Sequence, residues 1–317
     1  MDLNPNNLYQ HYCNKIINKT TYLNSLLILI ENSTEANSRI EAINQLKKLG
    51  VKSNNIYEIM ENLLLSDSDA KVRNAAADHI GALFFEKSFR VLNWAIKHER
   101  SYECVITMIN TLKKMLSNES KGLLKSEVLK IRKQNINLNE KQYIFKKYKK
   151  GIKKLLKLKK FNDLSIEHLS EILINYKTVI YLAFKFPNFY YELEKTTGLV
   201  SEIDLSDYLQ YEVKGTPWGW KNNISSNSSF KEIKNLKELK KIDLSNNLIK
   251  DLEFLSGFNK LETLILVNNK ISDLKNFHYI EQLPNLKLVD LRGNEIVNKL
   301  NKTQISSKVR IIKHNYV

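Results

Sequence analysis

One spacing of leucine, asparagine and isoleucine recurs three times near the end of this chain and constrains its fold more than any other feature. Each copy follows L-x-x-L-x-L-x-x-N-x-I, with Ile or Val at the second leucine in two copies. The copies begin at Leu239, Leu261 and Leu286, so they lie 22 and then 25 residues apart. The central L-x-L alternation predicts a short strand with one buried face. One copy cannot bury its own leucines, so the copies are expected to stack.

The asparagine of each copy is expected to be buried where the chain turns, because an amide carries both hydrogen-bond donors and acceptors. The pattern resembles the leucine-rich repeat, and the last copy resembles the terminal repeat of the short class found in some phosphatase regulators and splicing proteins. The resemblance covers about residues 230–300 and implies an arc that binds proteins, with a parallel sheet on its inner side. A degenerate capping unit is expected to begin near Asn222.

The first third of the chain has helical periodicity instead and predicts three helix pairs. The pairs are 21–31 with 34–49, 54–65 with 69–84, and 86–97 with 101–116. From Asp69 to Leu83 the sequence reads D-x-x-V-R-x-A-A-A-x-x-I-G-x-L. It resembles the second helix of a HEAT repeat, and the resemblance implies that Asp69 and Arg73 contact neighbouring units. The first copy has Arg39 at the equivalent place, whereas the third has Val105.

Positive charge is concentrated in residues 121–160, which carry 15 Lys and Arg against two Glu, and so +13 of the formal net charge of +16. The abundance of Lys, Asn, Ile and Tyr is typical of an AT-rich genome, so codon bias contributes to this excess. A helix is predicted over 138–160, with Tyr148, Ile152 and Leu155 on its apolar face, and another over 165–184.

The lysine-rich helix has three interpretations: a solvated face, a site for nucleic acid or another polyanion, or contact with an anionic membrane surface or acidic protein. In the second, lysines neutralise phosphates and four aromatic side chains stack on bases. Those aromatic residues are Tyr143, Phe145, Tyr148 and Phe161. The candidate polyanion-binding residues are Lys146, Lys147, Lys149, Lys150, Lys153 and Lys154. The near absence of arginine disfavours base-specific recognition.

The sequence contains no recognised catalytic motif, glycine-rich phosphate loop or metal-binding Cys and His spacing. We therefore expect a non-enzymatic protein with no catalytic residues, cofactor or metal. Asp243 and Asp290 occupy equivalent repeat positions, but acid–base catalysis by them is disfavoured because Asp commonly decorates this position. No apolar run is long enough to predict a membrane span. The two cysteines, Cys13 and Cys104, fit a reducing compartment, so a cytoplasmic location is expected.

The residues that alternate with the buried strand leucines are expected to line the concave face and to bind a protein partner. They are Lys241, Asp243, Ser245, Thr263, Ile265, Val267, Leu288, Asp290 and Arg292. Three of them, Ile265, Val267 and Leu288, would form an exposed apolar patch rimmed by charge, as at many interfaces. The alternative is that another part of this chain covers them.

The predicted fold class is α plus α/β. It comprises HEAT-like repeats over 1–117, a basic helical extension over 118–190, a linker and cap over 191–221, and leucine-rich repeats over 222–317. In the linker, Val200, Ile203 and Leu205 resemble one repeat strand but lie too far from Leu239 to form the next unit. The segment Trp218-Gly219-Trp220 either plugs the open end of the repeat core or contacts a ligand.

The predicted function is a non-enzymatic scaffold or adaptor that binds proteins through curved repeat surfaces. The alternatives are polyanion binding through helix 138–160, and regulation of a phosphatase or small GTPase by analogy with the repeat class. The sequence leaves the partner, the oligomeric state and the relative orientation of the two halves open.

Overall fold

The computed structural model describes residues 4–133, 142–157, 161, 163–207, 224–225, 230–300 and 309–313. The segment Trp218-Gly219-Trp220 and the side chains of Tyr143 and Phe145 lie outside the described part, so the predictions made for them are not addressed below. The chain divides into two compact units. The first comprises Met1–Val128 with Ser165–Ser170, and the second comprises Leu129–Leu164 with Glu171–Val317.

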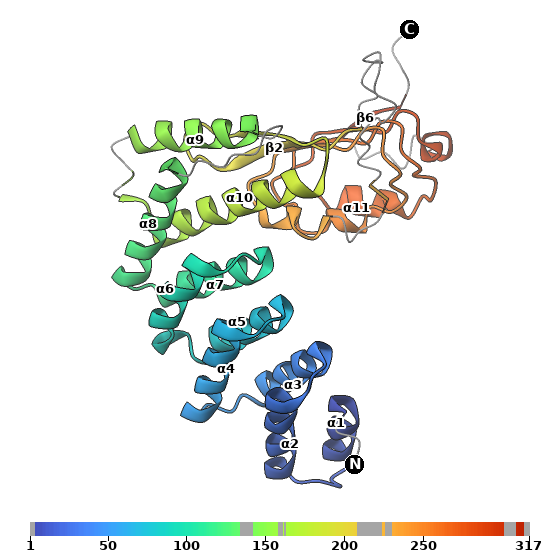
Figure 1. Cartoon of the computed structure of the whole chain (residues 1–317). Coiled ribbons are helices and arrows are strands. Elements are labelled where there is room, and N and C mark those ends of the chain that lie inside the picture. Colours follow the sequence, from blue (N-terminus) through green and yellow to red (C-terminus); the bar gives the residue numbers. More distant parts are fainter. Residues whose placement is uncertain are drawn as a thin grey trace, which may run out of the picture. The chain divides into compact units, whose positions relative to one another are not determined.

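The first unit is helical, and the three predicted helix pairs are confirmed (Figure 1). A short helix, α1, precedes the pairs, and a single 3-10 turn, Phe85–Lys87, precedes the last of them. The helices are α1 (Pro5–Cys13), α2 (Lys19–Asn32), α3 (Ala36–Leu49), α4 (Asn54–Ser66), α5 (Ala70–Leu83), α6 (Phe89–His98) and α7 (Tyr102–Met115). Two further helices, α8 (Asn118–Lys133) and α10 (Ile166–Lys185), contribute residues to both units. Helix α8 lies within the segment 118–190 that the sequence predicts as a helical extension, although the sequence patterns do not define its bounds.

Polar residues define where these helices begin. The side chains of Asn18, Ser53 and Asp69 each accept a hydrogen bond from a backbone N–H of the first turn. Such caps satisfy donors that the helix itself leaves unpaired. Helix α3 ends at Gly50, whose φ of 66° lies in the left-handed region that glycine adopts without strain.

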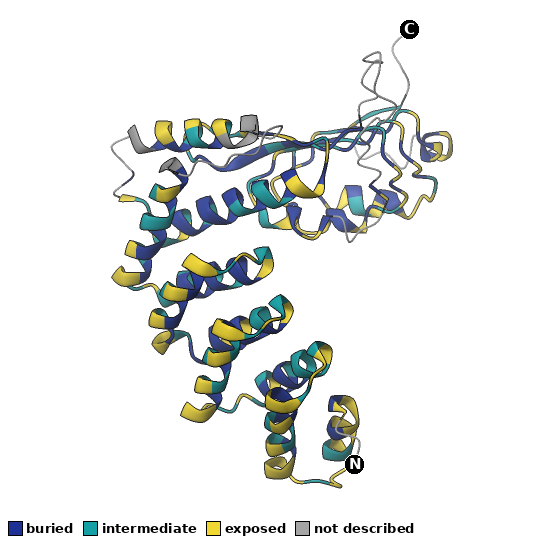
Figure 2. Cartoon of the chain, viewed as in Figure 1, coloured by how far each residue is buried: buried dark blue, intermediate teal, exposed yellow. Residues whose placement is uncertain are grey.

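The second helices of the three pairs pack side by side, because α3 contacts α5 and α5 contacts α7. Their buried faces are dark blue in Figure 2. Helix α5 buries small residues, since Ala76 and Ala77 are fully buried. A Cβ atom at Gly81 would lie 2.2 Å from Thr111 Oγ1 of α7, so the close approach of these two helices at this point depends on the glycine.

The second unit contains a six-stranded sheet with the order β1-β2-β3-β4-β5-β6. Strands β2 to β6 run parallel, and β1 pairs with β2 in the antiparallel sense. The strands are β1 (Tyr190–Leu193), β2 (Val200–Asp204), β3 (Lys241–Asp243), β4 (Thr263–Ile265), β5 (Leu288–Asp290) and β6 (Arg310–Ile312). The chain is thus a helical N-terminal region followed by a small, mostly parallel sheet.

Strand β2 corrects one expectation from the sequence. The sequence spacing predicts that the segment from Val200 to Leu205 is too far from Leu239 to form the preceding unit. In the structure, however, β2 pairs with β3, and Ile203 lies opposite Ile242. The spacing argument was wrong because the added free energy of closing a longer loop grows only slowly with its length. The L-x-L alternation, which places Ile203 and Leu205 in the core, determined the pairing. Strand β1 begins at the last residue of the predicted extension, 118–190, and β2 lies within the predicted linker and cap, 191–221.

The inward positions of the strands form one continuous core. Ile203, Ile242, Leu264 and Val289 lie opposite one another on neighbouring strands, and each is at most 1% exposed. Short helical turns form the layer on the other side of this core. They are Ile233–Asn235, Glu253–Leu255, α11 (Asn276–Glu281) and Glu295–Lys299. Across this layer the rings of Phe230 and Phe254 stack with centroids 3.7 Å apart.

The repeated asparagines are buried where the chain turns, as predicted, and they also join successive units. The Asn269 amide donates to Leu244 O at 2.9 Å and to Leu266 O at 3.0 Å, and its Oδ1 accepts from Ile249 N at 3.0 Å. Asn247 and Asn294 make the same set of bonds one unit earlier and one unit later. Each buried amide therefore ties its own turn to the backbone of the preceding unit.

Candidate partner-binding surface

The outward side chains of β3, β4 and β5, with the residues that follow each strand, occupy one face of the sheet, as the alternation predicted. Lys241, Thr263 and Leu288 lie opposite one another, and so do Asp243, Ile265 and Asp290. Eight of the nine predicted residues are half-buried, and Asp290 is buried. Ile265, Val267 and Leu288 are therefore partly covered rather than fully exposed, so the apolar patch is smaller than expected.

Two carboxylates on this face share one local arrangement. The Asp243 Oδ1 accepts from Ser245 Oγ at 2.6 Å and from Ser245 N at 3.0 Å. Asp204 Oδ1 accepts from Ser206 Oγ at 2.6 Å and from Ser206 N at 2.8 Å. The same arrangement is visible in the sequence as two Asp-Leu-Ser tripeptides, at 204–206 and 243–245, which the repeat spacing alone does not identify. Asp204, which is half-buried, extends the predicted surface by one strand, whereas Ser206 is buried beneath it.

Charge on this face is mixed. Burial, together with the neighbouring charge of Asp204, raises the pKa of Asp243 above its ordinary value, while the hydrogen bonds from Ser245 oppose the shift. At the far side, Asp290 forms an ion pair with Arg292, with Oδ2 and Nη2 2.7 Å apart. Strand β4 lies between Asp243 and Asp290, so these two carboxylates are separated by two strand spacings of about 4.8 Å each. They do not form a contacting carboxylate pair.

The lysine-rich helix is α9 (Gln142–Lys157), and it lies against β1 at the edge of the sheet (Figure 1). Its apolar face is buried as predicted, since Tyr148, Ile152 and Leu155 are at most 3% exposed. A Cβ atom at Gly151 would lie 2.5 Å from Leu193 Cδ1. Helix α9 therefore packs closely on the side chains of the edge strand β1.

The predicted base-stacking role fails for two of the four aromatic residues. Tyr148 is fully buried and its hydroxyl donates to Ile172 O at 3.1 Å, and Phe161 is 7% exposed. Neither ring can stack on a base, because each belongs to the core. The candidate lysines also divide into two groups. Lys146, Lys150, Lys153 and Lys154 are exposed, whereas Lys147 is half-buried and pairs with Glu192, and Lys149 is half-buried.

In the helical unit, ion pairs connect successive helix pairs. Arg39 Nη2 lies 3.2 Å from Asp67 Oδ1, and Arg73 binds Glu99 through two bonds of 2.7 and 3.0 Å. The contact expected of Arg73 with a neighbouring unit is confirmed. Asp69 instead caps its own helix, accepting hydrogen bonds from Lys71 N and Val72 N.

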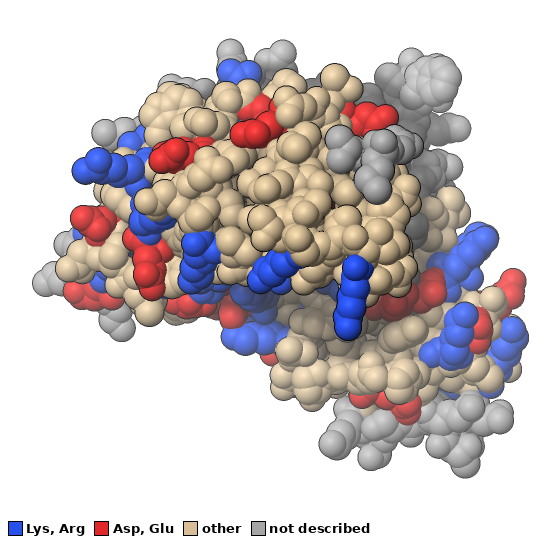
Figure 3. Space-filling view, turned by 90° about the horizontal axis from the view of Figure 1, so that it is seen from below, with Lys and Arg blue, Asp and Glu red and all other residues tan. Residues whose placement is uncertain are grey.

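Among the residues that the structure describes, no group of His, Cys, Asp and Glu is arranged to hold a metal ion. In the same part of the chain, no helix has both the length and the apolarity that crossing a bilayer requires. Figure 3 shows Lys and Arg side chains interspersed with acidic ones on the face in view. Comparison with known proteins adds no assignment, since no protein-family model, curated protein or solved structure matches the chain.

Proposed function

We propose that this chain is a non-enzymatic interaction scaffold whose second unit is a short leucine-rich-repeat arc that binds a partner protein through the outward face of β3, β4 and β5. In this proposal, the helix pairs of the first unit stack as a HEAT-like α-solenoid. The three copies of the leucine and asparagine pattern, with their strands in register, are the observation that carries the proposal.

Two features support a binding role for this face. The inward leucines form the buried core and the asparagines join the units, which leaves the outward side chains as the surface that a partner could contact. Those side chains combine half-buried Ile265, Val267 and Leu288 with charged Asp243 and Arg292, a composition typical of a partner surface.

A crosslinking pull-down tests the proposal. The full chain is immobilised and incubated with lysate of its source cells, and crosslinked proteins are quantified by mass spectrometry. We expect one or more stoichiometric partners, and a loss of at least tenfold with Ile265→Asp combined with Leu288→Asp. The matched control is Leu274→Asp, because Leu274 is an exposed apolar residue outside the strands and is 37% exposed. Recovery of no stoichiometric partner, or equal loss with the control, contradicts the proposal.

A second candidate function is polyanion binding by α9. The exposed Lys146, Lys150, Lys153 and Lys154 recur at intervals of four, three and one along the helix, so they share one face. No ion pair of these four lysines is recorded within the described part of the chain. A row of free cations of this kind contacts phosphates without reading bases.

The test of this candidate is binding of a fluorescein-labelled single-stranded RNA at several salt concentrations. Four lysine contacts predict a slope of log affinity against log salt of roughly −3. Changing the four lysines to Gln should abolish binding, whereas the same change at four other exposed lysines, Lys52, Lys234, Lys250 and Lys270, should leave it nearly unchanged. Equal loss in both variants would mean that only net charge matters. Regulation of a phosphatase or small GTPase remains a prediction of the repeat resemblance alone.

A further inference from the structure

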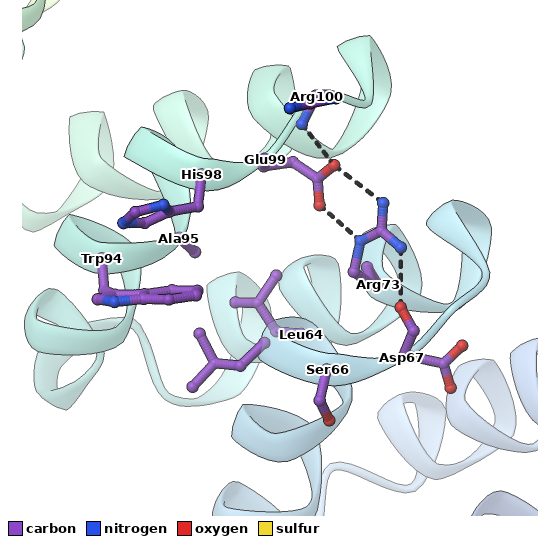
Figure 4. Close-up of a pocket in the computed structure, with 10 residues that line it drawn as sticks. Leu64, Ser66, Asp67, Arg73, Trp94, Ala95, His98, Glu99 and Arg100 are labelled. Carbon is purple, nitrogen blue, oxygen red and sulfur yellow. Dashed lines mark hydrogen bonds and ion pairs between the residues drawn. The ribbon is translucent and has the colours of Figure 1, made fainter.

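A pocket of about 310 Å³ lies within the helical unit, between the end of α4 and the end of α6 (Figure 4). Its apolar part is formed by Leu64 and Leu65 of α4 and by Trp94 and Ala95 of α6. Arg73, Glu99 and Arg100 form its polar side. The volume is at the lower end of the range for ligand pockets and suits one or two side chains of a bound peptide.

Trp94 is the anomalous residue of this pocket. Val91, Leu92, Ala95 and Ile96 form the buried face of α6, and Trp94 lies outside that face with 50% of its surface exposed. An amphipathic surface helix normally carries a polar residue at such a position. The indole is held in place by His98, whose ring stacks on it at 4.3 Å between centroids. Tryptophan is one of the three residue types, with tyrosine and arginine, that are enriched in the hot spots of protein interfaces.

The charges around the pocket leave one cation in surplus. Asp67 is paired with Arg39, and Glu99 is held by both guanidinium bonds of Arg73. The exposed Arg100 side chain has no recorded ion pair with any residue that the structure describes. The ends of α4 and α6 contribute partial negative charge, but Arg73 offsets it at the α4–α5 turn by donating to Asp67 O at 2.8 Å. The pocket therefore favours an anionic group beside Arg100.

We propose that this pocket docks a short acidic segment of a partner protein, with one aliphatic or aromatic side chain against Trp94 and a carboxylate on Arg100. Figure 4 shows His98 alongside one face of the indole and Leu64 beside its edge, so the accessible surface suits a compact side chain better than a stacked base. The proposal concerns a different surface from the outward face of the sheet and does not depend on it.

Selection from a phage-displayed library of random octapeptides on the immobilised full chain identifies the preferred ligand. We expect enriched peptides to carry an aliphatic or aromatic residue within two positions of Asp or Glu. The enriched peptide is then labelled with fluorescein, and its affinity for the full chain is measured by anisotropy at 50 and 200 mM NaCl. Because Arg100 is exposed, the affinity should fall at the higher salt concentration.

Three variants test the geometry. Trp94→Ser and Arg100→Glu should each weaken peptide binding at least tenfold, while Lys97→Glu should change it less than twofold. Lys97 is the matched control, since it is exposed on α6 but does not line the pocket. Ile265→Asp in the sheet should also leave the affinity unchanged, which separates this proposal from the proposed function.

Several outcomes would overturn the proposal. These are enrichment of peptides without acidic residues, unchanged affinity in Arg100→Glu, equal losses in Arg100→Glu and Lys97→Glu, and displacement of the peptide by a single-stranded RNA. Circular dichroism establishes that each variant is folded. If Trp94→Ser fails to fold, the affinity of Arg100→Glu tests the proposal alone, because the Arg100 side chain is exposed and its replacement should not affect folding.

Discussion

Replacement of Asn269 by Ala is the perturbation that best tests how the repeat units are held together. Asn269 is 4% exposed, and its amide satisfies Ile249 N, Leu244 O and Leu266 O. Alanine would leave Ile249 N without its partner, whereas Leu244 O and Leu266 O would each lose one bond but keep another, from Asn247 and Asn294 respectively. At about 1–3 kcal/mol for the unsatisfied donor and roughly 0.5 kcal/mol for each of the two lost bonds, the free energy of unfolding should fall by about 2–4 kcal/mol.

The assay is urea denaturation of the full chain followed by far-ultraviolet circular dichroism, comparing midpoints at constant slope. Asn298→Ala is the control, since Asn298 is exposed and should change stability by less than about 0.5 kcal/mol. Asn269→Asp adds a second test. A buried carboxylate facing two carbonyls is destabilising, and protonation relieves it, so this variant should lose more stability at pH 7 than at pH 4. A loss below about 1 kcal/mol in Asn269→Ala would refute the reasoning.

Three other predictions concern the helical unit. Arg73→Ala leaves the Glu99 side chain, which is 5% exposed, without its ion pair. The free energy of unfolding, measured by urea denaturation, should therefore fall by about 3 kcal/mol. A loss of stability no larger than that of Arg90→Ala would contradict this. Burial lowers the pKa of His79 to about 4, so the unfolded chain binds the proton more readily and stability should decline as the pH falls from about 6.5 towards 4. His79→Leu should flatten that part of the stability profile, and an unchanged slope would show that His79 is not its cause. Gly81→Ala should destabilise by about 1–3 kcal/mol because its Cβ would lie 2.2 Å from Thr111 Oγ1, and adding Thr111→Ala should recover part of the loss.

The sequence predicted the sheet well because two kinds of residue report on it independently. The alternating leucines define which side of each strand is buried, and the asparagines mark each turn, so three aligned copies left little freedom in register. Strand β2 was not predicted because its copy of the pattern lacks the asparagine and lies 39 residues before the next copy. Spacing identifies regular units but does not detect an insertion between two of them.

The strand register agrees with the predicted alternation, but the outward residues are less exposed than predicted. Alternation places Ile265 and Val267 on the outward face, whereas the extent of their burial depends on neighbouring strands that a single repeat does not specify. The ion pair between Lys147 and Glu192 could not be predicted from the sequence either, because it joins α9 to β1, a strand that the sequence patterns do not indicate. The Trp94 pocket was missed for a similar reason: its walls come from two helix pairs about thirty residues apart.

Site-specific photocrosslinking from the outward face measures the central claim most directly. A benzophenone amino acid is placed at Thr263, on the outward side of β4, and in a second variant at Ser256, which is exposed in the outer layer of the same unit. Both variants are irradiated in lysate of the source cells and analysed by mass spectrometry. A repeat arc that binds through its sheet predicts a covalent adduct with one partner from Thr263 and none from Ser256. Equal labelling from both positions, or no adduct from Thr263, would contradict it.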